Sequence, residues 1–113
     1  MKAVGCPRPL PITDPDSLQD FELPKPDPRA RDLLVRVEAV SVNPVDTKIR
    51  RSQSADHQEA SPRVLGWDVA GIVESVGSDV SLFQAGDEVY YSGNLIRPGA
   101  NSEYHLVDER LVA

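Results

Sequence analysis

The chain has 113 residues, of which 40% are hydrophobic and 27% are charged, a composition typical of a globular protein with a single core. Its 18 acidic and 12 basic side chains give a net charge of −6, which argues against binding to the phosphate backbone of nucleic acids. No stretch is long and apolar enough to span a bilayer, and the N-terminus lacks the apolar core of a signal peptide. We therefore expect a cytoplasmic protein.

Cysteine and histidine are too scarce to support disulfide or structural zinc chemistry. Cys6 is the only cysteine, so it cannot form an internal disulfide, and we expect it to pack as a small apolar group. One cysteine and two distant histidines cannot build a structural zinc cage. His57 lies in the polar segment 52–62 and is expected to be solvated, and His105 is expected on the surface of a strand.

The first half of the chain is predicted to consist of short extended pieces. Ten prolines, most of them before residue 63, divide it and favour a β-rich architecture. Residues 1–6 and 17–23 are predicted to be the first two strands. Residues 33–42 alternate between apolar and polar side chains, which predicts a strand with one buried face.

A short helix is predicted directly after that strand, from the sequence NPVDTKIR at residues 43–50. Asn43 suits the N-cap, Pro44 suits the first helical position, and Asp46 lies in the first turn, where an acid complements the helix dipole. Arg50 falls near the C-terminal end of the helix, where a cation is favourable. The helix should be one or two turns long.

The segment 64–89, VLGWDVAGIVESVGSDVSLFQAGDEV, predicts two strands joined by a turn. Gly71 interrupts the first of them, which indicates a β-bulge or a close approach of another backbone. Asp68 is a charge in a largely apolar stretch, so it needs a polar partner. A last strand is predicted at residues 103–107.

Three segments in register, SVNPVD, residues 64–89 and NSEYHLVDERL, resemble the N-terminal catalytic domain of the medium-chain dehydrogenase/reductase superfamily. More narrowly, they are similar to its zinc-independent quinone oxidoreductase branch, the relatives of zeta-crystallin. The resemblance implies a mainly β, GroES-like fold: a partly open antiparallel β-barrel with one or two short helices. It also implies that residues 1–113 are the catalytic domain and that the Rossmann cofactor domain lies outside them, so we expect a fragment that is inactive alone.

Zinc-dependent members of the superfamily have a ligand cysteine where this chain has Asn43 and a ligand histidine where it has Trp67. An amide and an indole cannot replace a thiolate and an imidazole, because zinc binds ionised sulfur and ring nitrogen. Asp68 matches the acidic neighbour of that histidine. By resemblance, we therefore expect no catalytic zinc in this protein.

The resemblance implies that the full-length enzyme transfers hydride from NADPH or NADH to a quinone or to the β-carbon of an α,β-unsaturated carbonyl. The candidate catalytic residues are Asn43, Asp46 and Trp67, and the candidate cofactor-binding residues are Asn43 and Arg50. The amide of Asn43 can both donate and accept hydrogen bonds. Each candidate also has a structural alternative: Asn43 as a helix cap, Asp46 as a partner of the helix dipole, Trp67 as a core anchor and Arg50 as a solvated helix end.

Two functions of another class stay open, a chaperonin-10-like assembly module and a structural role like that of a lens crystallin. The choice between NADPH and NADH is made around the adenosine ribose in the cofactor domain, so these residues do not decide it. The resemblance also leaves the substrate undecided. Because similar full-length enzymes are often dimers, a homodimer is one expected state.

Overall fold

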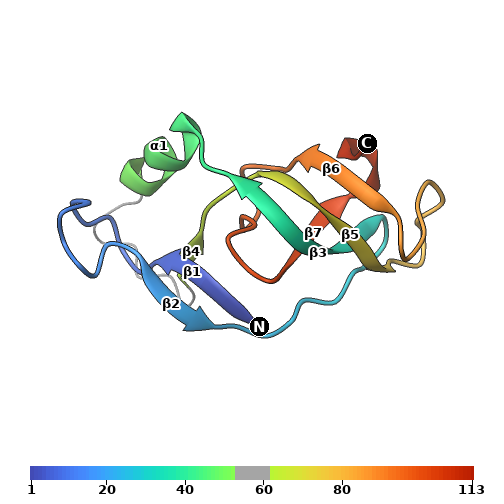
Figure 1. The fold of residues 1–113 in the computed structure, drawn as a ribbon, viewed down its shortest axis with the longest axis horizontal. Helices are drawn as coiled ribbons and strands as arrows, with labels where there is room; N and C mark the ends of the chain where they lie inside the picture. Colours follow the sequence, from blue (N-terminus) through green and yellow to red (C-terminus); the bar gives the residue numbers. More distant parts are fainter. Residues whose placement is uncertain (53–61) are drawn as a thin grey trace.

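The computed structural model describes residues 1–52 and 62–113, which form two antiparallel sheets and a short helix (Figure 1). In chain order the elements are β1 (Lys2–Cys6), β2 (Gln19–Glu22), β3 (Asp32–Ser41), α1 (Pro44–Ser52), β4 (Arg63–Val64), β5 (Asp68–Val76), β6 (Glu88–Ser92), β7 (Tyr104–Asp108) and the 3-10 helix η1 (Glu109–Leu111). The strand orders are β2-β1-β4 and β6-β5-β3-β7. Within the described residues the sheets do not close into a complete barrel, so the predicted mainly β, partly open architecture is confirmed.

Most predicted elements lie within a residue or two of their expected positions. The strand expected at residues 33–42 is β3, the pair expected in the segment 64–89 is β5 and β6, and the expected helix is α1. The second strand is shorter than predicted, because Ser17 still belongs to a turn in which its N–H donates to the Asp14 carbonyl at 3.1 Å. His57 lies outside the described residues.

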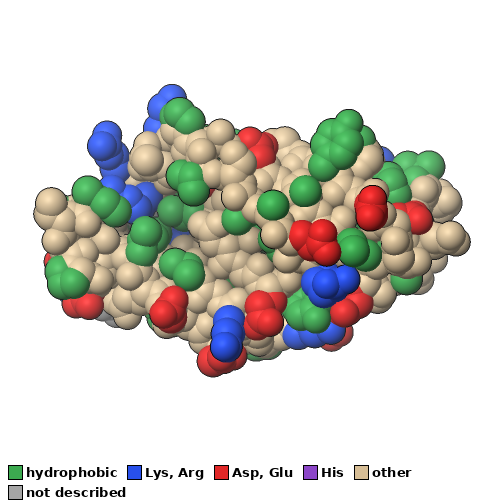
Figure 2. All heavy atoms as spheres, in the orientation of Figure 1, with side chains coloured by type: hydrophobic (Ala, Val, Ile, Leu, Met, Phe, Trp, Pro, Cys, Tyr) green, Lys and Arg blue, Asp and Glu red, His purple; other side chains and the backbone are tan. Residues whose placement is uncertain are grey.

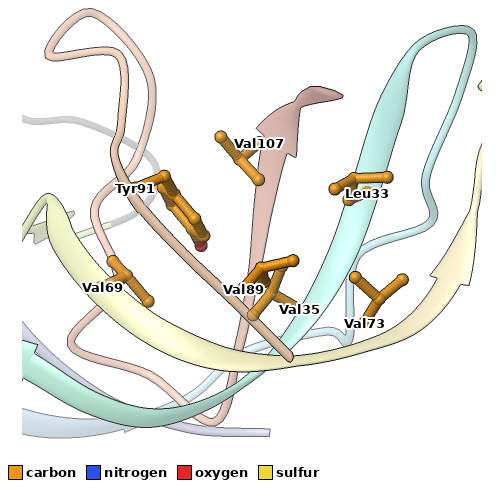
Figure 3. Close-up of a cluster of buried hydrophobic side chains, with 8 residues drawn as sticks. Leu33, Val35, Val69, Val73, Val89, Tyr91 and Val107 are labelled. Atoms are coloured by element: carbon orange, nitrogen blue, oxygen red, sulfur yellow. The ribbon is translucent and has the colours of Figure 1, made fainter. Parts of the chain in front are cut away.

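The larger of two cores lies against one face of the four-stranded sheet. Figure 3 shows its side chains pointing toward one another from all four strands: Leu33, Val35, Val69, Val73, Val89, Tyr91 and Val107. Each apolar side chain of this size contributes about 1.5–3 kcal/mol when it is fully buried. The core therefore holds β3, β5, β6 and β7 together as one unit.

A smaller core lies between the three-stranded sheet and α1. It contains Cys6, Leu65 and Trp67, with Ile49 of α1 packed against them. Cys6 is 1% exposed, and burial raises the pKa of its thiol, which keeps the sulfur protonated. The prediction that Cys6 packs as a small apolar group is confirmed.

The surface carries charges of both signs. Figure 2 shows basic side chains near α1 and interspersed acidic and basic side chains along the lower edge of the visible face. No helix in residues 1–52 or 62–113 has both the length and the apolar character needed to cross a membrane.

Gly71 lies where the backbone of β3 approaches β5 too closely for a side chain on β5. It pairs with Val37, and the register between the two strands shifts just after Val37. A side-chain carbon at position 71 would collide with the carbonyl oxygen of Arg36 and would lie 2.7 Å from Cγ1 of Val35. The predicted irregularity and close backbone approach at Gly71 are confirmed.

Replacing Gly71 with Ala should lower the free energy of unfolding by about 1–3 kcal/mol, because the added methyl group must push the β3 backbone away. The midpoint of urea unfolding measures this change. Ala70→Ser, on the exposed face of the same strand, serves as the control and should alter stability by less than about 0.5 kcal/mol. Equal midpoints for Gly71→Ala and the wild type would contradict the packing constraint.

Candidate functional site

The site lies where β3 ends, α1 begins and β5 begins. Strand register places Ser41 opposite Asp68, and Asp68 opposite Ser92 on β6. Asn43 follows two residues after Ser41, in the connection between β3 and α1. Polar side chains from three consecutive strands of the sheet are thus collected at one end.

Asp68 is the centre of this polar cluster. Its Oδ2 accepts a hydrogen bond from Asn43 Nδ2 at 2.5 Å, and its Oδ1 accepts one from Ser92 Oγ at 2.8 Å. The sequence predicted that Asp68 needs a polar partner, and the structure supplies two. Ser92 was missed, and the signal that could have found it is its position opposite Asp68 in the predicted pair of strands.

Asn43 occupies the N-cap position of α1 without using its side chain as a cap. Its backbone carbonyl accepts from the N–H of Asp46 at 3.0 Å, and its backbone N–H donates to Asp46 Oδ2 at 2.7 Å. Its side-chain amide donates instead to Asp68 and, over a longer 3.4 Å, to the Ser41 carbonyl. A capping role alone therefore does not account for Asn43.

Asp46 joins the start of α1 to the segment before β5. Its side chain is buried, and its Oδ1 accepts the backbone N–H of Gly66 at 2.7 Å, while Oδ2 accepts that of Asn43. Gly66 has a φ of +92°, a conformation that favours glycine. Because both carboxylate oxygens hold backbone groups of separate segments, the helix dipole alone does not explain this residue.

Asp46→Asn should lower the free energy of unfolding by about 2–3 kcal/mol, because an amide NH₂ then faces one of two backbone N–H donors that the carboxylate satisfied. Thermal or urea unfolding monitored by circular dichroism measures the loss. The exposed Asp20, changed to Asn, is the matched control and should leave stability nearly unchanged. If the two variants are equally stable, the hydrogen bonds from Asn43 and Gly66 to Asp46 are not a significant source of stability.

Trp67 directly precedes Asp68 in the chain and lies in the smaller core. The side chain is 2% exposed, and its Nε1–H donates to the carbonyl of Arg97 at 3.3 Å. Its ring packs with Cys6 and Leu65. This environment is the one that the core-anchor alternative predicts for Trp67.

Arg50 is also buried, so the alternative of a solvated helix end is wrong for this residue. It is 8% exposed, and its Nη1 donates to the carbonyl of Leu10 at 2.5 Å. Leu10 lies in the connection between β1 and β2, a contact that the helical pattern alone does not reveal. Contact of Arg50 with a cofactor stays a prediction.

His105 is buried, which corrects the prediction that it lies on the surface of a strand. It is 4% exposed, its Nε2 lies 3.0 Å from the Pro98 carbonyl, and its Nδ1 lies 2.7 Å from the hydroxyl of Tyr91. Because the Pro98 carbonyl can only accept, Nε2 carries the proton and the Tyr91 hydroxyl donates to Nδ1. The alternation in β7 was correct, but His105 belongs to its inner face together with Val107.

Burial lowers the pKa of His105 to about 4, with the nearby charge of Arg97 acting in the same direction and the hydrogen bond to Pro98 acting against it. Burial also raises the pKa of the Tyr91 hydroxyl. The stacked pair, with ring centroids 5.7 Å apart, is therefore neutral at neutral pH.

This neutral histidine makes stability depend on pH. The pKa is depressed on folding from 6.5 to about 4, so the unfolded chain binds more protons in this window and stability falls as the pH falls through it. The loss should approach about 3 kcal/mol by pH 4. Urea unfolding at a series of pH values measures the slope.

His105→Gln keeps a donor for the Pro98 carbonyl but does not titrate, so it should lose less stability than the wild type between pH 6.5 and 5. The carboxylates titrate in both proteins, so the difference between their slopes isolates His105. Identical slopes would show that His105 does not titrate differently in the folded state.

The donor chemistry of the cluster does not fit a zinc ion. Asn43 and Trp67 present N–H groups that donate to Asp68 and to the Arg97 carbonyl, and neither nitrogen offers a lone pair to a metal. In the part of the chain that the structure describes, no three His, Cys, Asp or Glu side chains are grouped to hold a metal. Among the described residues, Asp68 supplies the carboxylate of the cluster.

Comparison with known proteins agrees with this fold. The family described as the alcohol dehydrogenase GroES-like domain matches residues 29–113. A zinc-type alcohol dehydrogenase-like protein of Staphylococcus epidermidis is 43% identical over 113 residues, which are 100% of this chain and 32% of the relative.

Two solved structures extend the comparison. A Rhizobium etli protein named after the zinc-dependent alcohol dehydrogenases superimposes with a TM-score of 0.92 at 60% identity, over 100% of this chain and 32% of its own. The Escherichia coli quinone oxidoreductase complexed with NADPH superimposes with a TM-score of 0.82 at 30% identity, over 100% of this chain and 32% of its own. The chain thus spans about a third of the length of these relatives. It belongs to the alcohol dehydrogenase GroES-like domain family, within the medium-chain dehydrogenase/reductase superfamily.

Proposed function

We propose that these residues form the catalytic domain of a zinc-independent, NAD(P)H-dependent oxidoreductase that reduces quinones or α,β-unsaturated carbonyls. The observation that carries this proposal is the hydrogen-bonded cluster of Asn43, Asp68 and Ser92. By resemblance, Asn43 stands where zinc-dependent relatives have a ligand cysteine. Asp68 directly follows Trp67, which stands where they have a ligand histidine. Similarity to a quinone oxidoreductase complexed with NADPH supports the choice of cofactor and substrate class.

In this proposal the nicotinamide supplies the hydride, and this domain binds and orients the reactants and keeps water away from them. Asn43 is half-buried at the start of α1 and is the residue that touches the bound molecules. Asp46 fixes the backbone of Asn43, and Trp67 is buried directly before Asp68 in the chain. Arg50 is buried near the C-terminal end of α1, where it donates to the Leu10 carbonyl. Asp46 and Trp67 therefore act as positioning residues, and contact of Arg50 with the cofactor belongs to the proposal.

The proposal requires a dinucleotide-binding domain in addition to these residues, because the described elements are arranged in antiparallel sheets and include no βαβ unit. We infer that residues 1–113 expressed alone do not turn over. A cytoplasmic location and a homodimeric assembly belong to the same proposal.

The test uses the complete enzyme that carries these residues, with NADPH oxidation followed in the presence of a quinone or an enone. Turnover should be the same before and after treatment with a zinc chelator, and elemental analysis should find well under one zinc per chain. Residues 1–113 alone should show no turnover under the same conditions.

One tightly bound zinc per chain, together with loss of turnover on chelation, would contradict the zinc-independent mechanism. Turnover by residues 1–113 alone would contradict the need for a cofactor domain. A heptamer in light scattering, combined with no turnover by the complete protein, would favour the chaperonin-10-like alternative over an enzyme.

A further inference from the structure

The contact between Asn43 and Asp68 fixes which atom of the Asn43 amide faces which partner. An ionised carboxylate only accepts hydrogen bonds, so the amide atom 2.5 Å from Asp68 Oδ2 must be the nitrogen. The same nitrogen donates a second, longer hydrogen bond of 3.4 Å to the Ser41 carbonyl. Both amide protons are therefore committed to the protein, and Oδ1 remains as the atom of this side chain that can meet a bound molecule.

Neighbouring contacts hold the amide in this orientation. Ser92 donates to the second oxygen of Asp68 at 2.8 Å, which restrains the rotation of the carboxylate. Asp46 restrains the backbone of Asn43 through the bond of 2.7 Å to its N–H. Rotating the amide by half a turn would set its oxygen against the Asp68 oxygen, and two acceptors at that distance repel each other. In the described part of the chain no residue donates to Asn43 Oδ1.

We propose that Asp68 is a positioning residue that fixes Asn43 as a hydrogen-bond acceptor, so that the site selects molecules bearing an N–H or O–H donor at this point. The identity of those molecules rests on the proposed function. The donor is either the carboxamide NH₂ of the nicotinamide ring or a hydroxyl of the reduced, phenolic product. Polarisation of a substrate carbonyl then falls to groups other than the Asn43 amide.

Two matched pairs of probes, tested on the complete enzyme, distinguish these sources. The first pair is NADPH and its reduced 3-acetylpyridine analogue, in which a methyl group replaces the amide NH₂ and the carbonyl is kept. The second pair is a hydroquinone and its dimethyl ether, which lacks the hydroxyl donors. The dissociation constants are measured by calorimetry without turnover, with the phenolic pair titrated against the oxidised cofactor complex.

In the wild type, the member of one pair that lacks the donor should bind about 3- to 10-fold more weakly, which is the worth of one neutral hydrogen bond. In Asp68→Asn the new amide can donate to Asn43 Oδ1, so the Asn43 amide is free to turn and the preference should vanish. Discrimination in the first pair assigns the donor to the cofactor, and discrimination in the second pair assigns it to the product.

Ser92→Ala should weaken the preference less than Asp68→Asn does, because the contact between Asn43 and Asp68 remains. Glu88→Gln removes an exposed carboxylate from the neighbouring strand β6 and should keep the full preference. The side-chain ¹⁵N–¹H signals of Asn43 report its orientation directly. One proton should be shifted downfield by the carboxylate in the wild type and in Glu88→Gln, but not in Asp68→Asn.

The proposal is overturned if the wild type discriminates in neither pair, or if Asp68→Asn keeps the wild-type preference. Failure of the proposed function is a separate result, namely that the complete protein does not bind NADPH at all. In that case the Asn43 amide signals still decide whether Asp68 fixes the side chain, because they need no ligand. Unshifted amide protons in the wild type would overturn the positioning role.

Discussion

The pairing of β3 with β5 runs from Leu33 opposite Val76 to Ser41 opposite Asp68. It is possible in this register because Gly71 lets the β3 backbone come closer than any side chain would allow. The same pairing buries the large core on one face and sets Ser41 beside Asp68 at its end. The geometry of the polar cluster therefore depends on the close approach of the two strands at Gly71, in the middle of the sheet.

Buried residues close in sequence to Asn43 and Asp68 hold the polar cluster in position. Asp46 accepts a hydrogen bond from the backbone of Gly66 and so connects it to the start of α1. The residue after Gly66 is Trp67, which is buried in the smaller core. The hydrogen bonds between Asn43 and Asp68 thus form between two segments that are already fixed, so little conformational entropy is lost when they form. Such preorganisation is what a site needs to orient a cofactor and a substrate.

The connection between β6 and β7 explains why two aromatic residues are interior. The Arg97 carbonyl in this connection accepts a hydrogen bond from Trp67 Nε1 at 3.3 Å. The Pro98 carbonyl lies 3.0 Å from Nε2 of His105. Arg97 also forms a bidentate pair with Asp32 at 2.8 and 3.0 Å. The side chains of Trp67 and His105 therefore hold this connection in place through hydrogen bonds to its backbone.

Local periodicity and residue type were enough to predict most of the strands, the start of α1, the irregularity at Gly71 and the family resemblance. They did not predict the short strand β4. The inward position of His105 depends on the folded chain, since alternation defines two faces of a strand without saying which one is buried. The burial of Arg50 depends on it too, because its partner Leu10 is 40 residues away in the chain. The same holds for the Asn43 amide. Its partner is 25 residues away, and only the paired strands bring Asp68 to it.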